Sequence, residues 1–325
     1  MRSRYLLILT AVWLYSGGAQ AQSPLPSLTL NVVATNSDGT PVTNLTANDL
    51  KVTDDGAKQE ITALRPNPSH GPTALVILFD LLNLNMAARG VVWQSIKQAM
   101  PEMPASDALY LYLLVKDGSL YPVHGLPPIA GGEQSSEASW IQNIGPLLNT
   151  AMNKVNQLRP TDLETQVNLR FQATYNALEK VRGNMAVIPG RKELIWATYG
   201  IPSSIRFAGN NWFDCTPLLR QLAARYNQSD IAIYTLDPGV NLNRGQLNRD
   251  TLDILTGMTG GRSFGTSDIR EAAVRAVADA RASYSLTYVP PTDEHAGKFR
   301  KVRVTSERRG MHIQAEEGYF TAPAH

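Results

Sequence analysis

The spacing of apolar residues divides the chain into three parts. Residues 28–66 alternate between apolar and polar positions, and Ser-Asp-Gly and Asp-Asp-Gly mark the turns between the runs. This period of two predicts three or more short strands. A proline-rich joint, PNPSHGPT at residues 66–73, then ends the pattern. After residue 283 the period of two returns in SYSLTYVPP, KFRKVRVTSER and GMHIQAEEGYF, which predicts three further strands.

Between these β-rich ends, short apolar runs alternate with amphipathic stretches. Apolar strands flanked by helices indicate a sheet that is covered on both faces, so we expect a mostly parallel, doubly wound α/β fold. The helical stretches are VVWQSIKQAM, ETQVNLRFQATYNALEKVRG, PLLRQLAARYNQ and SDIREAAVRAVADARAS. The predicted strands are ALVILFD, ALYLYLLVKD, KELIWATYG, DIAIYTLD and GRSFG.

Ligands of doubly wound sheets bind at the carboxyl ends of the strands. Four residues fall at such ends here, namely Asp80, Asp117, Gly200 and Asp237. Asp80 follows the most apolar strand, and Asn83 and Asn85 come shortly after it among leucines. The loop after ALVILFD is therefore the first candidate for a functional site.

Six segments in this order resemble the bacterial von Willebrand factor A-related domain proteins, and together they span nearly all of the chain after residue 27. The resemblance implies a doubly wound A-like domain at residues 73–282 and a role in binding rather than catalysis. The segments are VTDDGAKQEI, VILFDLLNLN, PGRKELIWATYGIP, IAIYTLDPG, LTGMTGGRSF and the tail from SYSLTYVPP to EEGYF.

The resemblance also implies a divalent cation held by D-x-S-x-S, a threonine from a second loop and an aspartate from a third. Asp80 matches the first ligand, but Leu82 and Leu84 occupy the serine positions. Tyr199 stands before Gly200 in the third loop, where the cation site needs an acidic residue. The metal set that remains is Asp80, Asn83 and Thr161. Its charge is low for Mg²⁺ or Ca²⁺, so we expect no tightly bound cation and no other cofactor.

Residues on the same loops make up the predicted partner-binding face. An alternative for Asp80 is a structural role, in which its carboxylate caps the next helix or accepts from loop amides. For Trp212, the alternative to partner contact is packing onto its own helix. The predicted partner-binding residues are Asp80, Asn83, Asn85, Thr161, Asp162, Tyr199 and Trp212.

A hydrolase is the alternative from another class, because Gly261–Gly265 fits G-x-S-x-G with Ser263 as nucleophile. A nucleophile elbow needs an apolar strand directly before the serine, whereas a helix ending in glycines precedes Ser263. The five histidines are scattered, and the lone Cys215 begins a helical pattern and is expected to be a buried thiol. A structural component of a cell-envelope assembly is a third alternative. We expect no enzyme activity.

Positive residues of the last strands alternate with valines. Arg300, Lys301, Arg303, Arg308 and Arg309 are therefore expected on the solvated face of a sheet.

The first 21 residues have the features of a signal peptide. Arg2 and Arg4 precede an apolar run, and Ala19-Gln20-Ala21 fits a signal-peptidase site, so we expect cleavage after Ala21 and a periplasmic or secreted protein. Cleavage removes both arginines, and the formal charge of +2 becomes 2 − 2 = 0. Such a balance disfavours nucleic acid as a partner. We expect a protein or another cell-envelope macromolecule as the partner, and no transmembrane segment in the mature chain.

The two β-rich ends are each too small for an independent core, since an isolated small sheet is only marginally stable in water. We therefore expect residues 28–65 and 284–320 to pack together as one small β-sandwich, into which the A-like domain is inserted.

Overall fold

The computed structural model describes most of the chain after residue 26. Predictions that concern the signal peptide, Thr161 or Asp162 lie outside the described residues. The structure describes residues 27–67, 74–103, 108–126, 141, 143–157, 166–206, 211–238, 246–291 and 297–321.

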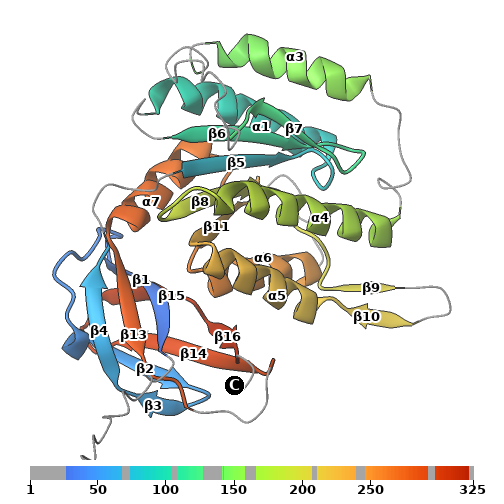
Figure 1. Ribbon diagram of the computed structural model, residues 1–325. Coiled ribbons are helices and arrows are strands. Elements are labelled where there is room, and N and C mark those ends of the chain that lie inside the picture. Colours follow the sequence, from blue (N-terminus) through green and yellow to red (C-terminus); the bar gives the residue numbers. More distant parts are fainter. Residues whose placement is uncertain are drawn as a thin grey trace, which may run out of the picture.

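A six-stranded sheet forms the centre of the α/β domain (Figure 1). Five strands run parallel, and β7 pairs antiparallel with β6 at one edge. The order β12-β11-β8-β5-β6-β7 puts β5 inside the sheet, between β6 and β8. The predicted doubly wound, mostly parallel fold is therefore confirmed. The strands are β5 (Ala74–Asp80), β6 (Leu109–Leu114), β7 (Leu120–His124), β8 (Lys192–Ala197), β11 (Ile231–Leu236) and β12 (Ser263–Phe264).

Helices cover both faces of this sheet (Figure 1). Successive side chains of a strand point to opposite faces, so Ile77 and Phe79 pack with one helical layer, and Val76 and Leu78 with the other. The first layer consists of α1 (Met86–Ala99), α3 (Ile144–Asn156) and α7 (Ile269–Arg281). The second consists of α4 (Val167–Ala186), α5 (Thr216–Gln228) and α6 (Gln246–Thr259).

The strands before and after the α/β domain form two four-stranded sheets, which we call the β module. In each sheet, strands from the two ends of the chain lie side by side. The first sheet has the order β15-β1-β13-β4, with β1 (Leu28–Asn36), β4 (Ile61–Pro66), β13 (Ser283–Tyr288) and β15 (Met311–Ala315). The second has the order β16-β14-β2-β3, with β2 (Leu50–Asp54), β3 (Ala57–Gln59), β14 (Phe299–Ser306) and β16 (Gly318–Phe320). Two 3₁₀-helices, Ala47–Asp49 and Met100–Glu102, complete the named elements, together with β9 and β10, which are described below.

One apolar cluster joins the two sheets of the β module. Leu30 of β1 pairs with Leu286 of β13, and Val52 of β2 pairs with Val304 of β14; all four side chains belong to this cluster. A polar contact also joins the sheets, because the Tyr288 hydroxyl donates to Asp54 Oδ2 across 3.0 Å. The two ends of the chain thus contribute side chains to the same core.

Three local features differ from the sequence-based expectation. The segment expected as one last strand is divided at Glu316, and its halves, β15 and β16, belong to different sheets. Arg300 is buried rather than solvated, because its Nε lies 2.7 Å from Asp54 Oδ1 inside the β module. The loop around Trp212 contains a strand, β10 (Trp212–Asp214), which pairs antiparallel with β9 (Ser204–Arg206).

Candidate functional site

Asp80 ends β5 at the carboxyl edge of the sheet. Its side chain is on the same face as Val76 and Leu78, so it points toward the layer that contains α4. Asp80 is completely buried. Leu82 and Leu84, which stand in place of ligating serines, are buried in the cores on opposite faces of the sheet. Leucine side chains therefore anchor the loop after β5 in the core at the two positions where the D-x-S-x-S pattern has ligating serines.

Five donors surround the Asp80 carboxylate. Oδ1 accepts from the backbone N–H groups of Leu82 at 3.0 Å and Asn83 at 2.8 Å. Oδ2 accepts from Asn83 Nδ2 at 2.8 Å, Trp196 Nε1 at 3.1 Å and Thr198 Oγ1 at 2.7 Å. A carboxylate offers about four lone-pair positions, so these donors use its whole accepting capacity.

Burial and hydrogen bonding act on Asp80 in opposite directions. Desolvation raises its pKa above the ordinary value, while the donors from Asn83, Thr198 and Trp196 lower it. The hydroxyl of Thr198 also accepts from Gly200 N at 2.9 Å, which fixes the start of the loop after β8. The carboxylate thus connects the loops that follow β5 and β8.

The other predicted residues of this face occupy different environments. Asn83 Nδ2 reaches Thr174 Oγ1 of α4 at 2.9 Å as well as Asp80. Asn85 is exposed and is the N-cap of α1, with its side chain accepting from Ala88 N at 2.9 Å. Tyr199 is buried in the layer opposite to Asp80. The structure brings together Asp80 and Asn83, whereas Asn85 and Tyr199 lie apart from that pair.

Trp212 lies on the hairpin formed by β9 and β10, which extends outward beyond the ends of α5 and α6 (Figure 1). The hairpin follows the carboxyl end of β8, so it belongs to the same edge as Asp80. The Trp212 side chain is 65% exposed and that of its neighbour Phe213 is 44% exposed. Ile205, on the opposite strand, is buried in the core and anchors the hairpin.

Ser263 lies in the short edge strand β12, and its Oγ accepts from Thr235 Oγ1 at 2.9 Å. It borders a small cavity of 210 Å³ together with Tyr199, Asp237 and Asp253. No described histidine lines this cavity: His124 is on β7, stacked on Tyr110, and His312 is on β15. Ser263 is inside a strand and not at a strand-to-helix elbow. Cys215 is buried, and burial raises its pKa to about 11.

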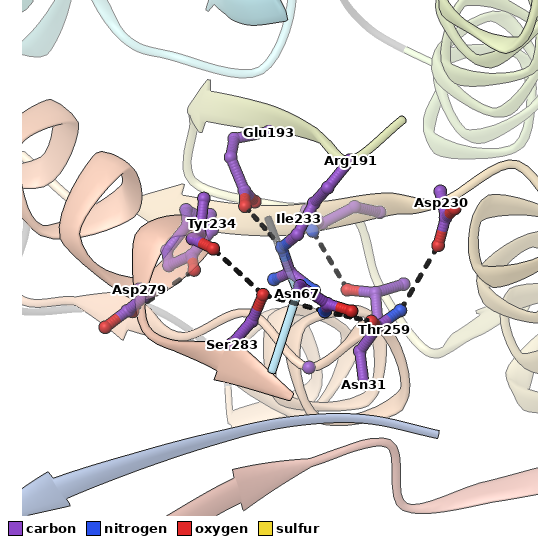
Figure 2. Close-up of polar contacts among 12 residues, drawn as sticks. Asn31, Asn67, Arg191, Glu193, Asp230, Ile233, Tyr234, Thr259, Asp279 and Ser283 are labelled. Atoms are coloured by element: carbon purple, nitrogen blue, oxygen red, sulfur yellow. Dashed lines mark hydrogen bonds and ion pairs between the residues drawn. The ribbon is translucent and has the colours of Figure 1, made fainter. Parts of the chain in front are cut away.

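The opposite, amino edge of the sheet meets the β module through a partly buried polar cluster (Figure 2). Arg191 Nε lies 2.7 Å from Glu193 Oε1, and Asp279 accepts from the Tyr234 hydroxyl at 3.1 Å. Asn31 of β1 donates through its backbone to Glu316 Oε1 and through its side chain to Asp230 Oδ1, each at 3.3 Å.

Burial dominates the electrostatics of this junction. Burial raises the pKa of Glu316 most strongly and the nearby charge of Asp230 also raises it, while the Asn31 N–H bond and Arg191 lower it, so that the pKa is about 7. A cleft of 710 Å³ next to Asp230 and Glu316 separates α5 from the β module. Sequence reasoning missed this cluster, because its members come from both ends of the chain and from three elements of the middle part. Their only local signal is the presence of charged residues beside buried strands.

Comparisons with known proteins gave matches among solved structures only. No protein-family model matches the sequence, and no curated protein matches it. The human COPII-coat protein Sec24c matches with 12% identity and a TM-score of 0.35 over 80% of this chain, which spans 44% of the length of that chain. The vWF domain of the type V pili tip protein Mfa5 from Porphyromonas gingivalis matches with 12% identity and a TM-score of 0.34, covering 65% of this chain and 94% of that chain.

These TM-scores are too low for either structure to inform on binding. The architecture itself is evident from the strand order, with β5 inside a doubly wound sheet and one antiparallel edge strand, β7. The α/β domain thus has the doubly wound, mostly parallel sheet that the sequence pattern predicted.

Proposed function

We propose that the chain is an exported protein-binding module that contacts its partner through the carboxyl edge of the A-like domain, without a bound cation and without catalysis. The observation that carries this proposal is the exposed hairpin, where Trp212 and Phe213 present apolar rings at an edge that the β module leaves uncovered (Figure 1). Tryptophan is enriched among the residues that dominate the energy of protein interfaces. A protein surface therefore fits this edge.

The Asp80 carboxylate supports a contact of this cation-free kind. A metal-dependent site needs an aspartate with free lone pairs and an open position for the partner, and the oxygens of Asp80 already accept five hydrogen bonds. Asp80 and Asn83 then act indirectly, because they fix the loop that leads to the exposed Asn85. Among the described residues Asn85 belongs to the proposed face, whereas Tyr199 is buried and supports the loop after β8 from inside. Thr161 and Asp162 stay members of the face by the sequence-based prediction alone.

The arrangement around Ser263 gives no support to the hydrolase alternative. Its hydroxyl is hydrogen-bonded to Thr235, and a general base within hydrogen-bonding distance is required for an activated serine. Among the described residues no histidine meets that requirement.

Export and the β module belong to the same proposal. Cleavage after Ala21 delivers the chain to the periplasm or the exterior, where a protein of the cell envelope is the partner we propose.

The two sheets of the β module form one sandwich around their shared cluster and carry the A-like domain by its amino edge. This mounting directs the carboxyl edge away from the β module. Among the described residues, no helix has the length and apolarity needed to cross a membrane.

Photo-crosslinking in the producing cell tests the proposal. A benzophenone amino acid at position 212 is expected to form one discrete crosslink to a protein, and the yield is expected to persist with EDTA. Val274 on α7 is the matched control position, because it is 58% exposed and far along the chain from the hairpin. Equal crosslinking from both positions, or crosslinks that EDTA removes, contradict the proposed contact.

A further inference from the structure

The outer face of the second sheet of the β module carries a positive surface. Residues alternate along β14, so Val302 and Val304 point into the core while Lys301 and Arg303 are exposed. The same alternation on β2 exposes Lys51. Lys58 of β3 lies opposite Thr53, and Arg303 lies opposite Thr53 on its other side. We call Lys51, Lys58, Lys301 and Arg303, with Thr53 and Thr305 between them, the basic face.

The cations of the basic face have no internal counter-charge. Within the described part of the chain, no ion pair involves any of these four side chains, although pairs are formed by arginines elsewhere, such as Arg300 and Arg308. The carboxylate that lines the same depression is that of Asp55, whose Oδ2 lies 3.6 Å from Arg300 Nη1 and whose Oδ1 accepts from Lys301 N. Four cations thus face solvent, and the carboxylate that lines the depression with Lys51, Lys301 and Arg303 is already paired. The mature chain is neutral as a whole, so this surface is a local concentration of charge.

The shape of the basic face favours an extended partner. A depression of 730 Å³ follows β2 and β14, and its lining includes Lys51, Thr53, Lys301, Arg303 and Thr305. Residues two apart on a strand, such as Lys301 and Arg303, are about 6.8 Å apart on the same side. A second extended polypeptide repeats its own side chains at the same spacing. Acidic residues at every second position of such a segment therefore meet one cation each, and the threonine hydroxyls are further donors to carboxylates.

We propose that the basic face binds an extended, acidic segment of a partner protein. Acidic side chains complement the cations of the basic face, and those of an extended segment repeat at the same spacing of about 6.8 Å as the side chains of β14. The surface lies on β2, β3 and β14, whereas the proposed contact of the A-like domain lies on the hairpin of β9 and β10. The inference does not depend on the function proposed for that hairpin.

Fluorescence anisotropy with the mature full-length chain tests this proposal. The probe is a labelled synthetic peptide of alternating glutamate and threonine, and a peptide of alternating glutamine and threonine is its neutral counterpart. We expect binding of the acidic peptide only, with an affinity that falls as salt is added. The double variant Lys51→Gln/Arg303→Gln should weaken binding about fivefold to tenfold, as expected for the loss of two exposed ion pairs.

The matched control is Lys154→Gln/Lys180→Gln, which removes the same charge from exposed lysines of α3 and α4. It should leave the affinity unchanged, as should Trp212→Ala, and all variants should keep the melting temperature because the substituted side chains are exposed. Equal weakening by the control variant overturns the proposal, as does failure of the acidic peptide to bind. Tighter binding of a sulfated polysaccharide or of anionic lipid vesicles than of the peptide also overturns it, because the partner is then not a protein segment.

Discussion

The Trp196 indole donates a hydrogen bond from Nε1 to Asp80 Oδ2 across 3.1 Å, although the two residues are 116 positions apart in the chain. Trp196 is on β8, where it pairs in register with Leu78 of β5, and this register places its ring beside the end of the neighbouring strand. Together with Thr198 it supplies the two donors that come from outside the loop that follows Asp80. This contact makes Asp80 part of the structure that holds two loops together.

Replacing Asp80 with alanine should therefore lower the stability of the fold. The change leaves the Trp196 indole, the Thr198 hydroxyl and two loop amides without their acceptor, and buried unsatisfied groups cost about 1–3 kcal/mol each. We expect the free energy of unfolding to fall by about 3 kcal/mol in urea titrations, since water and rearrangement recover part of the loss. Asn85→Ala removes one helix cap on the exposed side and should cost only about 1 kcal/mol. A loss for Asp80→Ala no greater than for Asn85→Ala would show that the carboxylate does not hold the loops.

Titration with Mg²⁺ or Ca²⁺ should give no heat of binding at micromolar or low millimolar concentrations. Both oxygens of Asp80 are occupied by donors, and the serine positions of the related metal site are the buried Leu82 and Leu84. Isothermal calorimetry of the wild type checks this expectation. A site of micromolar affinity that disappears in Asp80→Asn would restore metal-dependent adhesion as the function.

Substitution of Ser263 should leave binding unaffected. Its hydroxyl contacts Thr235, and it has no histidine partner among the described residues. Ser263→Ala should crosslink from position 212 as well as the wild type does, and serine-directed phosphonates should not label the protein in mass spectrometry. Stoichiometric labelling at Ser263 is the result that would favour the hydrolase.

The polar cluster between the α/β domain and the β module should make the free energy of unfolding depend on pH. The pKa of Glu316 is about 7 in the folded protein, against 4.5 for the ordinary group, because the side chain is buried beside Asp230 and Asn31. Between those two values the folded state binds more protons than the unfolded state, so stability is highest at the acidic end and falls as pH rises. From this group alone we expect a loss of about 2–3 kcal/mol between pH 4.5 and 7.5.

The variant Glu316→Gln separates this contribution from those of other groups. Glutamine has no charge to desolvate, so the variant should lose less stability between pH 5 and 7.5 than the wild type in denaturant titrations. Glu60→Gln, which changes an exposed glutamate after β3, is the control and should retain the wild-type profile. Identical pH profiles for Glu316→Gln and the wild type would show that groups other than Glu316 cause the pH dependence of stability.

Deletion of residues 22–66 should expose the strands of the C-terminal segment. β13 then loses both of its neighbours, β1 and β4, and β14 loses β2. Unpaired strand edges associate with other chains, so we expect the truncated protein to form aggregates visible in light scattering. A truncated protein that stays monomeric, with the amides of β13 and β14 still protected from exchange, would show that the two chain ends are independent.

The local pattern of the sequence determined the elements and the class of the fold. Each core strand is apolar throughout, as in ALVILFD, because both faces of a parallel sheet are buried, and this is a property that neighbouring residues carry by themselves. The same pattern placed Asp80 at the end of β5 and showed that Leu82 and Leu84 cannot be ligands. Within the α/β domain, β7 and the hairpin of β9 and β10 escaped prediction because their residues, apart from Ile205, are only partly buried or exposed.

Only the tertiary structure decided which residues meet. Asp80 is saturated because β8 pairs with β5 in a register that brings Trp196 and Thr198 beside it, and no local periodicity encodes that register. Arg300 and Lys301 look alike in sequence, yet one is buried against Asp54 and the other is exposed. The reason is physical: the period of a segment depends on its own residues, whereas burial, charge pairing and pKa depend on the partners that distant segments supply.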